Sequence, residues 1–319
     1  MVRYQFSADV KAYIEHLRPH LSESTLKDKH RKLRLISRNF TELYEEKKVS
    51  TNNPRRLTVD DVVAYVAFRR SEKIAESTIS KDLCALGSLL SWLGNRVIEE
   101  FRALGSIYKP HSYTGRKPPM PRNLIERIIE LSRKTNDWRI LRGCTMVLLC
   151  AAGGLRSQEA RKLYAPDVTM VNGHMIVHIE HVKGEGRYAD PRNVLIVGGV
   201  EDIILRYLDS RAEKLREAGK ESRAMFPPLN NDSEFYSQQA FCSLKKCVEE
   251  ELGEKFDLRS ARRAFGQFLL DCGNRIEDVS VAMGHSSTKT TEGYYARNRE
   301  EQVMDRILQN QADRQSKNH

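Results

Sequence analysis

A stretch rich in proline and basic residues, from residue 109 to residue 122, divides the chain into two parts with different patterns. It has neither a helical nor a strand period, and its prolines remove backbone donors and restrict the residues before them. The 319 residues are enough for two domains with separate cores. We therefore expect a first domain at 1–108, a linker at 109–122, a second domain at 123–299 and a C-terminal tail at 300–319.

Apolar residues recur at helical spacing along the whole first part, which shows no strand pattern. Hydroxyl side chains, which accept hydrogen bonds from the first backbone N–H groups of a helix, stand at or near the start of each apolar run. They are Ser7, Ser24, Thr58 and Ser77. We predict four helices that pack as a small bundle.

The second part combines helical patterns with two alternating stretches, at 175–179 and 193–197. These stretches flank Lys183-Gly184-Glu185-Gly186, whose glycines are typical of a hairpin tip. The expected fold class is therefore mainly α. It consists of a helical bundle followed by an α+β domain that is mostly helical and carries a small antiparallel sheet.

The net charge of +10 is distributed unevenly along the chain. Residues 1–123 contain 23 lysines and arginines against 14 acidic residues, whereas residues 124–300 contain 27 against 26. An excess of positive charge confined to one part of a chain is typical of a module that binds a polyanion, which favours DNA as the partner. On the second expected helix, the residues that we predict to contact DNA are Lys27, Lys29, Arg31, Lys32 and Arg34.

Several classes of protein do not fit this composition. Apolar residues make up 40% and charged residues 30%, which is typical of a globular protein, and the longest weakly polar run, Cys144 to Leu155, is too short for a bilayer span. The N-terminus lacks the apolar region of a secretion signal, so we expect a cytoplasmic protein that does not associate with a membrane. The six cysteines form no C-x-x-C pair, and we expect them to be reduced.

Three histidines and a glutamate lie close together in the sequence, at His174, His178, Glu180 and His181. In an extended strand the first three would share a face while His181 would point away, and the spacing matches no zinc signature. We therefore expect no metal site.

Four stretches of the second part carry basic or nucleophilic side chains next to glycines or at expected helix ends. The first runs from Gly153 to Ala160 and places Arg156 and Glu159 on one helical face. The second is Lys183, and the third contains Arg259 and Arg262. The fourth contains Gly284, expected to end a helix, followed by His285 and by Tyr294 nine residues further on.

In this order the four stretches resemble the tyrosine recombinase, or phage-integrase, family, and most closely its archaeal integrases. The family pattern contains an arginine in a G-L-R-x-x-E context, a hairpin lysine, a His/Lys/Arg-x-x-Arg box, a G-H/W box and a tyrosine. The resemblance implies that Arg156, Lys183, Arg259, Arg262, His285 and Tyr294 are catalytic, with Glu159 in support. It also implies that the first domain is a helical core-binding domain.

The same resemblance implies an activity. It is that of a site-specific recombinase that cleaves and rejoins DNA strands through a 3′-phosphotyrosine intermediate, without a metal or cofactor. Its partners would be double-stranded DNA and, on DNA, three further copies of the chain in a homotetramer. Away from DNA, the chain could be a monomer or a dimer. The tail has an apolar stripe that could dock on a neighbouring subunit or on its own domain.

The residue types suit this chemistry. Arginine offers a permanent cation and a planar fork for the phosphate oxygens, so we expect Arg156 and Arg262 to clamp the phosphate. A tyrosine hydroxyl has a pKa of about 10, so Tyr294 needs nearby cations to become a nucleophile. Lys183 would give a proton to the leaving 5′ oxygen, and His285 would bind the phosphate or assist proton transfer. Glu159 would hold Arg156 in place.

Some assignments stay open at this stage. Tyr295 competes with Tyr294, and Arg187 could take the place of Lys183. Arg259 stands at a position where the commonest members of the family have a histidine. Arginine cannot exchange protons near neutral pH. A type IB topoisomerase, which relaxes a single duplex, and a catalytically silent DNA-binding regulator are the alternative functions.

Overall fold

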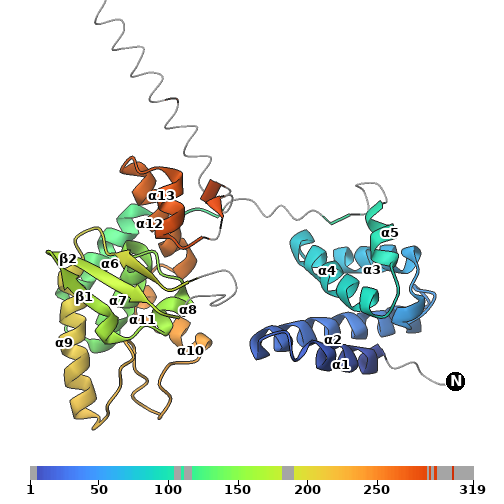
Figure 1. Ribbon diagram of the computed structural model, residues 1–319, viewed down its shortest axis with the longest axis horizontal. Helices are drawn as coiled ribbons and strands as arrows, with labels where there is room; N and C mark the ends of the chain where they lie inside the picture. The colour runs from blue at the N-terminus through green and yellow to red at the C-terminus, as the bar shows by residue number, and fades with distance from the viewer. Residues whose placement is uncertain are drawn as a thin grey trace, which may run out of the picture. The chain divides into compact units, whose positions relative to one another are not determined.

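The computed structural model describes residues 6–103, 109–110, 117–181, 190–285, 287–288, 291–292 and 304. The chain divides into two compact units, Met1–Gly115 and Arg116–His319 (Figure 1). Each unit has a hydrophobic core of its own. None of the described helices is both long and apolar enough to cross a membrane.

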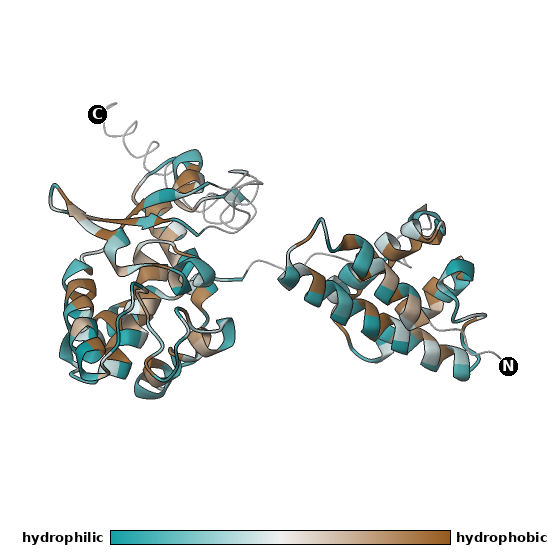
Figure 2. Ribbon diagram, turned by 60° about the horizontal axis from the view of Figure 1, so that its bottom comes forward, coloured by the Kyte–Doolittle hydropathy of each residue, from teal (hydrophilic) through white to brown (hydrophobic). Residues whose placement is uncertain are grey.

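The first unit is entirely helical in its described residues. Its elements are α1 (Phe6–Leu17), α2 (Glu23–Glu45), the 3₁₀ turn η1 (Pro54–Arg56), α3 (Val59–Ser71), α4 (Glu76–Trp92) and α5 (Val97–Ala103). Hydrophobic and hydrophilic residues alternate along these helices, as expected for helices with one buried face (Figure 2). In the core, the ring of Phe40 stacks on the rings of Phe6 and Tyr65, at centroid distances of 6.0 and 5.0 Å.

The helix starts differ in part from the sequence prediction. Thr58 caps α3 as expected, and Asp61 completes a capping box with it. The side chain of Ser22, rather than Ser24, caps α2. Ser7 and Ser77 lie inside α1 and α4, so neither is a cap. A fifth helix, α5, was also not predicted, because a segment of seven residues is too short to show a helical period.

The second unit is built around α7, most of which is buried. Figure 1 shows this helix among α6, α9, α11 and α12, all of which contact it. The elements are α6 (Arg122–Lys134), α7 (Trp138–Ala152), α8 (Ser157–Arg161), η2 (Ala165–Asp167), β1 (Val168–Val171), β2 (His174–Ile179), β3 (Arg192–Leu195), α9 (Glu201–Glu217), α10 (Gln238–Ser243), α11 (Lys246–Leu252), α12 (Leu258–Asp271) and α13 (Ile276–Ala282).

The apolar residues at 235–251 follow a single helical period in the sequence, but the structure has two short helices there, α10 and α11. The break between them lies where the chain packs against Gly143 of α7. A Cβ atom on Gly143 would lie 2.9 Å from the carbonyl oxygen of Leu244. A tertiary contact of this kind leaves no signal in the helical period.

The three strands form an antiparallel sheet in the order β1-β2-β3. The buried side chains of Met175, Val177, Ile179 and Val194 attach it to the core. Strand β1 was not predicted, because most of its side chains are exposed and give no alternation of apolar and polar residues. The pair Asn172-Gly173, with φ of 51° and 79°, forms the two-residue turn between β1 and β2, and this Asn-Gly signal was available in the sequence.

The residues directly before α6 pack on α12. Met120 is buried, and its N–H donates to the carbonyl oxygen of Ser260 at 2.9 Å. The Nε atom of Arg263 donates to the carbonyl oxygen of Pro118 at 2.9 Å. This end of the proline-rich stretch is therefore attached to the second unit.

Candidate active site

The carboxylate of Glu159, on α8, lies at the centre of a cluster of three arginines. Its side chain is 1% exposed. Arg156 donates to it twice, from Nη1 at 2.7 Å and from the backbone N–H at 2.8 Å. Arg192 donates to both oxygens, at 3.1 and 2.9 Å, and Nη1 of Arg262 lies 3.7 Å from Oε2. Burial would raise the pKa of Glu159, but the bonds and charges of Arg192 and Arg156 lower it to about 2.

Two glycines place Arg156 at the start of α8. Helix α7 ends at Ala152, and Gly154 has a φ of +63°, which glycine adopts without strain. A Cβ atom on Gly154 would lie 2.4 Å from the ring of Phe265 on α12. The close approach of α12 and the left-handed turn therefore both require glycine here. The Nη2 atom of Arg156 donates to the carbonyl oxygen of Gly284 at 2.8 Å.

Arg262, on α12, is only 8% exposed. Its guanidinium group donates to the carbonyl oxygens of Gly154 and Met283, the turns that follow α7 and α13. Burial and the charge of Arg156 lower the pKa of Arg262 to about 10, against the opposing charge of Glu159. Arg262 is therefore still a cation at neutral pH, and it joins α12 to two separate turns.

The turn after α13 places His285. Gly284 has a φ of +61° and is the residue after the C-cap of the helix, which confirms the prediction that it ends a helix. Its N–H donates to the carbonyl oxygen of Val281 at 2.8 Å, and the N–H of His285 donates to that of Ser280 at 3.0 Å. These two bonds form a Schellman motif, so the backbone of the turn fixes the position of His285.

The imidazole ring of His285 is held on one side and kept neutral. Its Nδ1 atom lies 2.8 Å from Oγ1 of Thr291, a fully buried residue that was not singled out in the sequence. Burial, followed by the charges of Arg262, Arg156 and Arg192, lowers the pKa of His285 to about 4. At neutral pH the ring therefore carries one N–H donor and one acceptor.

Arg192 is the member of the cluster that sequence reasoning missed. It is the first residue of β3, and it points to the same face of the strand as the buried Val194. The signal in the sequence was a charged residue two positions before an apolar one, on the same face of an expected strand. A charge on a buried face needs a partner inside the protein.

The other predicted catalytic residues are not part of this cluster. Arg259 is exposed on α12, one turn before Arg262, and makes no hydrogen bond or ion pair within the described ranges. Lys183, its rival Arg187, and the tyrosines Tyr294 and Tyr295 lie outside the described residues. The structure thus brings together Arg156, Glu159, Arg262 and His285, and it adds Arg192 and Thr291.

The charge of the cluster suits an anion. Three guanidinium groups face one carboxylate, which leaves an excess of two positive charges. Phosphate oxygens match the planar fork of arginine. Among the described residues no group of three or more histidine, cysteine, aspartate or glutamate side chains could hold a metal ion.

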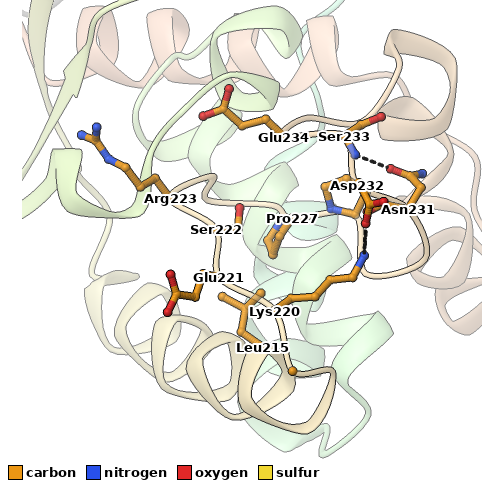
Figure 3. Close-up of a pocket in the computed structure, with 12 residues that line it drawn as sticks. Leu215, Lys220, Glu221, Ser222, Arg223, Pro227, Asn231, Asp232, Ser233 and Glu234 are labelled. Carbon is orange, nitrogen blue, oxygen red and sulfur yellow. Dashed lines mark hydrogen bonds and ion pairs between the residues drawn. The ribbon is translucent and has the colours of Figure 1, made fainter.

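A pocket of about 680 Å³ lies elsewhere in the second unit, between the end of α9 and the loop that follows it (Figure 3). None of the residues that line it belongs to the arginine cluster. Three acidic side chains, Glu221, Asp232 and Glu234, line it with two basic ones, Lys220 and Arg223, and Lys220 donates to the carbonyl oxygen of Asn231 at 2.7 Å. Its net charge is negative, unlike that of the arginine cluster, so it suits a phosphate group less well.

The five basic residues predicted to bind DNA all lie on α2, but they differ in environment. Lys27, Arg31 and Arg34 are exposed, whereas Lys29 and Lys32 are partly buried. The Nζ atom of Lys29 lies 5.4 Å from the ring centroid of Tyr13, and burial lowers its pKa. Arg38, which the sequence analysis did not select, is exposed on the same side of α2 as Lys27, Arg31 and Arg34, since these positions are three or four residues apart.

Two family models match the chain. The phage integrase family matches residues 120–302, and the phage integrase N-terminal SAM-like domain matches residues 10–96. These matches confirm the expected fold class, a helical first domain followed by a mostly helical domain with a small sheet. The particular resemblance to archaeal integrases finds no support in the comparisons.

Curated relatives and solved structures agree with the family models. Tyrosine recombinase XerC of Roseiflexus castenholzii is 26% identical over 246 residues, which cover 76% of each chain. Tyrosine recombinase XerC of Neisseria meningitidis serogroup B is 25% identical over 290 residues, 90% of each chain. The fold is similar to that of the XerH site-specific recombinase bound to its palindromic difH substrate, with a TM-score of 0.64 and 17% identity over 90% of this chain and 80% of that one. It is also similar to the Tn1549 transposon integrase in complex with a circular intermediate DNA, with a TM-score of 0.66 and 15% identity over 93% and 99% of the chains.

Proposed function

The chain belongs to the phage integrase family and is a site-specific tyrosine recombinase, and we propose that the arginine cluster around Glu159 is its active site and Tyr294 its nucleophile. The family match spans the whole cluster and extends past Tyr294. The relatives are recombinases, so the topoisomerase and the silent regulator are not favoured. The observation that carries the assignment of the site is the excess positive charge at Arg156 and Arg262, beside the neutral ring of His285.

In the proposed reaction, the hydroxyl oxygen of Tyr294 attacks the phosphorus atom of the scissile phosphate. The bond from phosphorus to the 5′ oxygen breaks, which gives a 3′-phosphotyrosine link and a free 5′ hydroxyl group. The 5′ hydroxyl group of a partner strand then attacks the phosphotyrosine and releases Tyr294. The bond from phosphorus to the tyrosine oxygen replaces the bond from phosphorus to the 5′ oxygen. Because one phosphoester bond takes the place of another, the cycle needs no separate energy source.

The basic residues have separate tasks in this proposal. Arg156 and Arg262 stabilise the charge on the non-bridging oxygens, and Lys183 donates a proton to the leaving 5′ oxygen. The Nδ1 atom of His285 is engaged by Thr291, so only Nε2 is left to meet the phosphate. Arg259 is exposed and always charged, so it contributes a positive charge to the bound DNA but exchanges no proton.

Double-stranded DNA is the partner, and we propose that α2 contacts its backbone through Lys27, Lys29, Arg31, Lys32 and Arg34. Two duplexes must be joined, so we propose a homotetramer on DNA in which residues 300–319 dock on a neighbouring subunit. The protein would act in the cytoplasm, at the nucleoid. Deleting 300–319 should abolish assembly on DNA and leave folding intact; loss of folding would contradict exchange of this tail between subunits.

Covalent trapping tests the assignment of the nucleophile. The wild-type protein is incubated with plasmid and genomic DNA, the reaction is stopped with detergent, and the attached DNA end is mapped. Wild-type protein and Tyr295→Phe should give a covalent complex at a 3′ end, whereas Tyr294→Phe should give none. A complex with Tyr294→Phe but not with Tyr295→Phe would reverse the choice of tyrosine, and none with wild-type protein would refute the proposal.

A further inference from the structure

Arg192 forms a two-pronged ion pair with Glu159. Its Nη1 and Nη2 atoms donate to Oε1 and Oε2 at 3.1 and 2.9 Å. The Arg192 side chain is 15% exposed and that of Glu159 is 1% exposed, so the pair is screened little by water. Glu159 is therefore paired with Arg192 of β3, in addition to Arg156, the N-cap residue of its own helix.

The other two arginines of the cluster rely more on neutral partners. Arg262 donates to the carbonyl oxygens of Gly154 and Met283, and it is 3.7 Å from the carboxylate. Arg156 donates to the carbonyl oxygen of Gly284 as well as to Glu159. Carbonyl oxygens fix the position of a guanidinium group without cancelling its charge. The positive charge that is available to a ligand therefore depends on how far the carboxylate of Glu159 neutralises these two arginines.

The guanidinium group of Arg192 is packed between Glu159 and the turn after α13. A Cβ atom on Gly284 would lie 2.7 Å from the Cζ and Nε atoms of Arg192, so the guanidinium packs against the backbone of that turn. Its Nε atom is buried and has no hydrogen-bond partner among the described residues. Arg192 is thus enclosed by Glu159 and by the turn that places His285.

We propose that Arg192 is a positioning residue of the recombinase site, which compensates the charge of Glu159 so that Arg156 and Arg262 present positive charge to the scissile phosphate. This inference rests on the proposed function. Without Arg192, the carboxylate would be balanced by Arg156 and Arg262 alone, and the excess positive charge of the cluster would fall from two to one. The phosphate would then meet a weaker field at the point where its charge must be stabilised.

The first test is a comparison of rates of covalent-complex formation on a substrate taken from the mapped cleavage site. Arg192→Met should slow the reaction by up to about 100-fold, which is the cost of removing one donor that stabilises the transition-state charge directly. Arg192→Lys keeps the positive charge and should retain most of the rate. A methylphosphonate at the scissile position has lost the negative charge of one non-bridging oxygen, so the loss caused by Arg192→Met should shrink to a few-fold on that substrate.

The second test is a double-mutant cycle with Glu159. If Arg192 compensates the carboxylate, then Glu159→Gln removes the need for it, and Glu159→Gln with Arg192→Met should react faster than Arg192→Met alone. A residue that only supports folding would also recover when the unpaired carboxylate is removed, but its loss would be equal on the two substrates. Equal losses on the two substrates would overturn the proposal, whether or not the double variant recovers.

Arg161→Met is the matched control. Arg161 is a partly buried arginine of α8, the helix that carries Glu159, and its Nη1 atom donates to the carbonyl oxygen of Tyr236. Thermal unfolding of all variants shows whether they are folded at the assay temperature. Wild-type protein and Arg161→Met should react at similar rates. If neither forms a covalent complex, the proposed function itself fails; if both do and the Arg192 variants behave like the control, only the role of Arg192 fails.

Discussion

The Nδ1 atom of His285 lies 2.8 Å from the Oγ1 atom of Thr291, whose side chain has no exposed surface. A buried hydroxyl group that meets one ring nitrogen fixes the rotation of the imidazole about its own axis. It also leaves the other nitrogen, Nε2, as the only one able to meet a ligand. Thr291, described as helical together with residue 292, is thereby linked to the turn after α13.

Thr291→Val should disturb this arrangement while keeping the volume of the side chain. Loss of the hydrogen bond leaves a ring nitrogen without its partner, so we expect the free energy of unfolding to fall by about 1 kcal/mol and covalent-complex formation to slow. Thr291→Ser keeps the hydroxyl group and should retain the activity. Denaturant unfolding and covalent trapping measure both effects. Equal activity of the valine and serine variants would show that the contact does not position His285.

The low pKa of His285 predicts a particular dependence of stability on pH. Burial and the neighbouring arginines hold the pKa near 4, below its ordinary value of about 6.5 in an unfolded chain. Below pH 6.5 the unfolded chain takes up a proton that the folded protein does not, so this group destabilises the fold progressively as the pH falls toward 4. Above 6.5 it has no effect.

Denaturant unfolding of wild-type protein and His285→Gln at several pH values checks this. The wild-type protein should lose stability relative to the variant between pH 6.5 and 4, and the difference should be constant above pH 7. An NMR titration of the imidazole should show no midpoint between pH 5 and 8. A midpoint near 6.5 would mean that neither burial nor the arginines act on this ring.

Gly154→Ala should be much more harmful than the same change at another glycine with positive φ. At Gly154 the new methyl group meets the ring of Phe265, and the left-handed backbone adds strain, so we expect a loss of stability of about 3 kcal/mol. At Gly173 no atom lies within 4 Å, and only the backbone strain of about 1 kcal/mol applies. Equal losses in denaturant unfolding would contradict the close approach of α12.

The basic residues of α2 should contribute unequally to DNA affinity. Arg34 is exposed, so Arg34→Gln should weaken binding and reduce the slope of log affinity against log salt by about one unit. The ammonium group of Lys29 is partly buried over the ring of Tyr13, so Lys29→Gln should reduce that slope by less than Arg34→Gln does. Titrations of labelled DNA at several salt concentrations measure both. A larger change of slope for Lys29→Gln than for Arg34→Gln would place the DNA on another face.

The parts of the fold that the sequence predicted depend on local signals. Thr58 and Gly284 mark a helix start and a helix end through contacts within a few residues. The contact between Arg156 and Glu159, expected from their spacing, is present at 2.7 Å. What was missed depends on distant contacts. Arg192 meets Glu159 only because β3 lies beside α8 in the folded protein.

Length and exposure explain the other differences. Helix α5 has too few residues to reveal a period, and β1 has too few buried side chains to reveal an alternation. The positions of Ser7 and Ser77 inside helices show that a hydroxyl residue near an expected start is not always the cap. The roles given to Lys183 and Tyr294 stay predictions, because these residues lie outside the described ranges.

Arg156 and Arg262 are held by the main-chain carbonyl oxygens of Gly154, Met283 and Gly284. Every amino acid supplies the same carbonyl group, so these contacts do not depend on the polarity of the side chains at the three positions. They depend on the shape of the two turns, which the left-handed backbone of Gly154 and Gly284 and the buried side chain of Met283 maintain. Residues that only shape the backbone thereby decide where two cations stand.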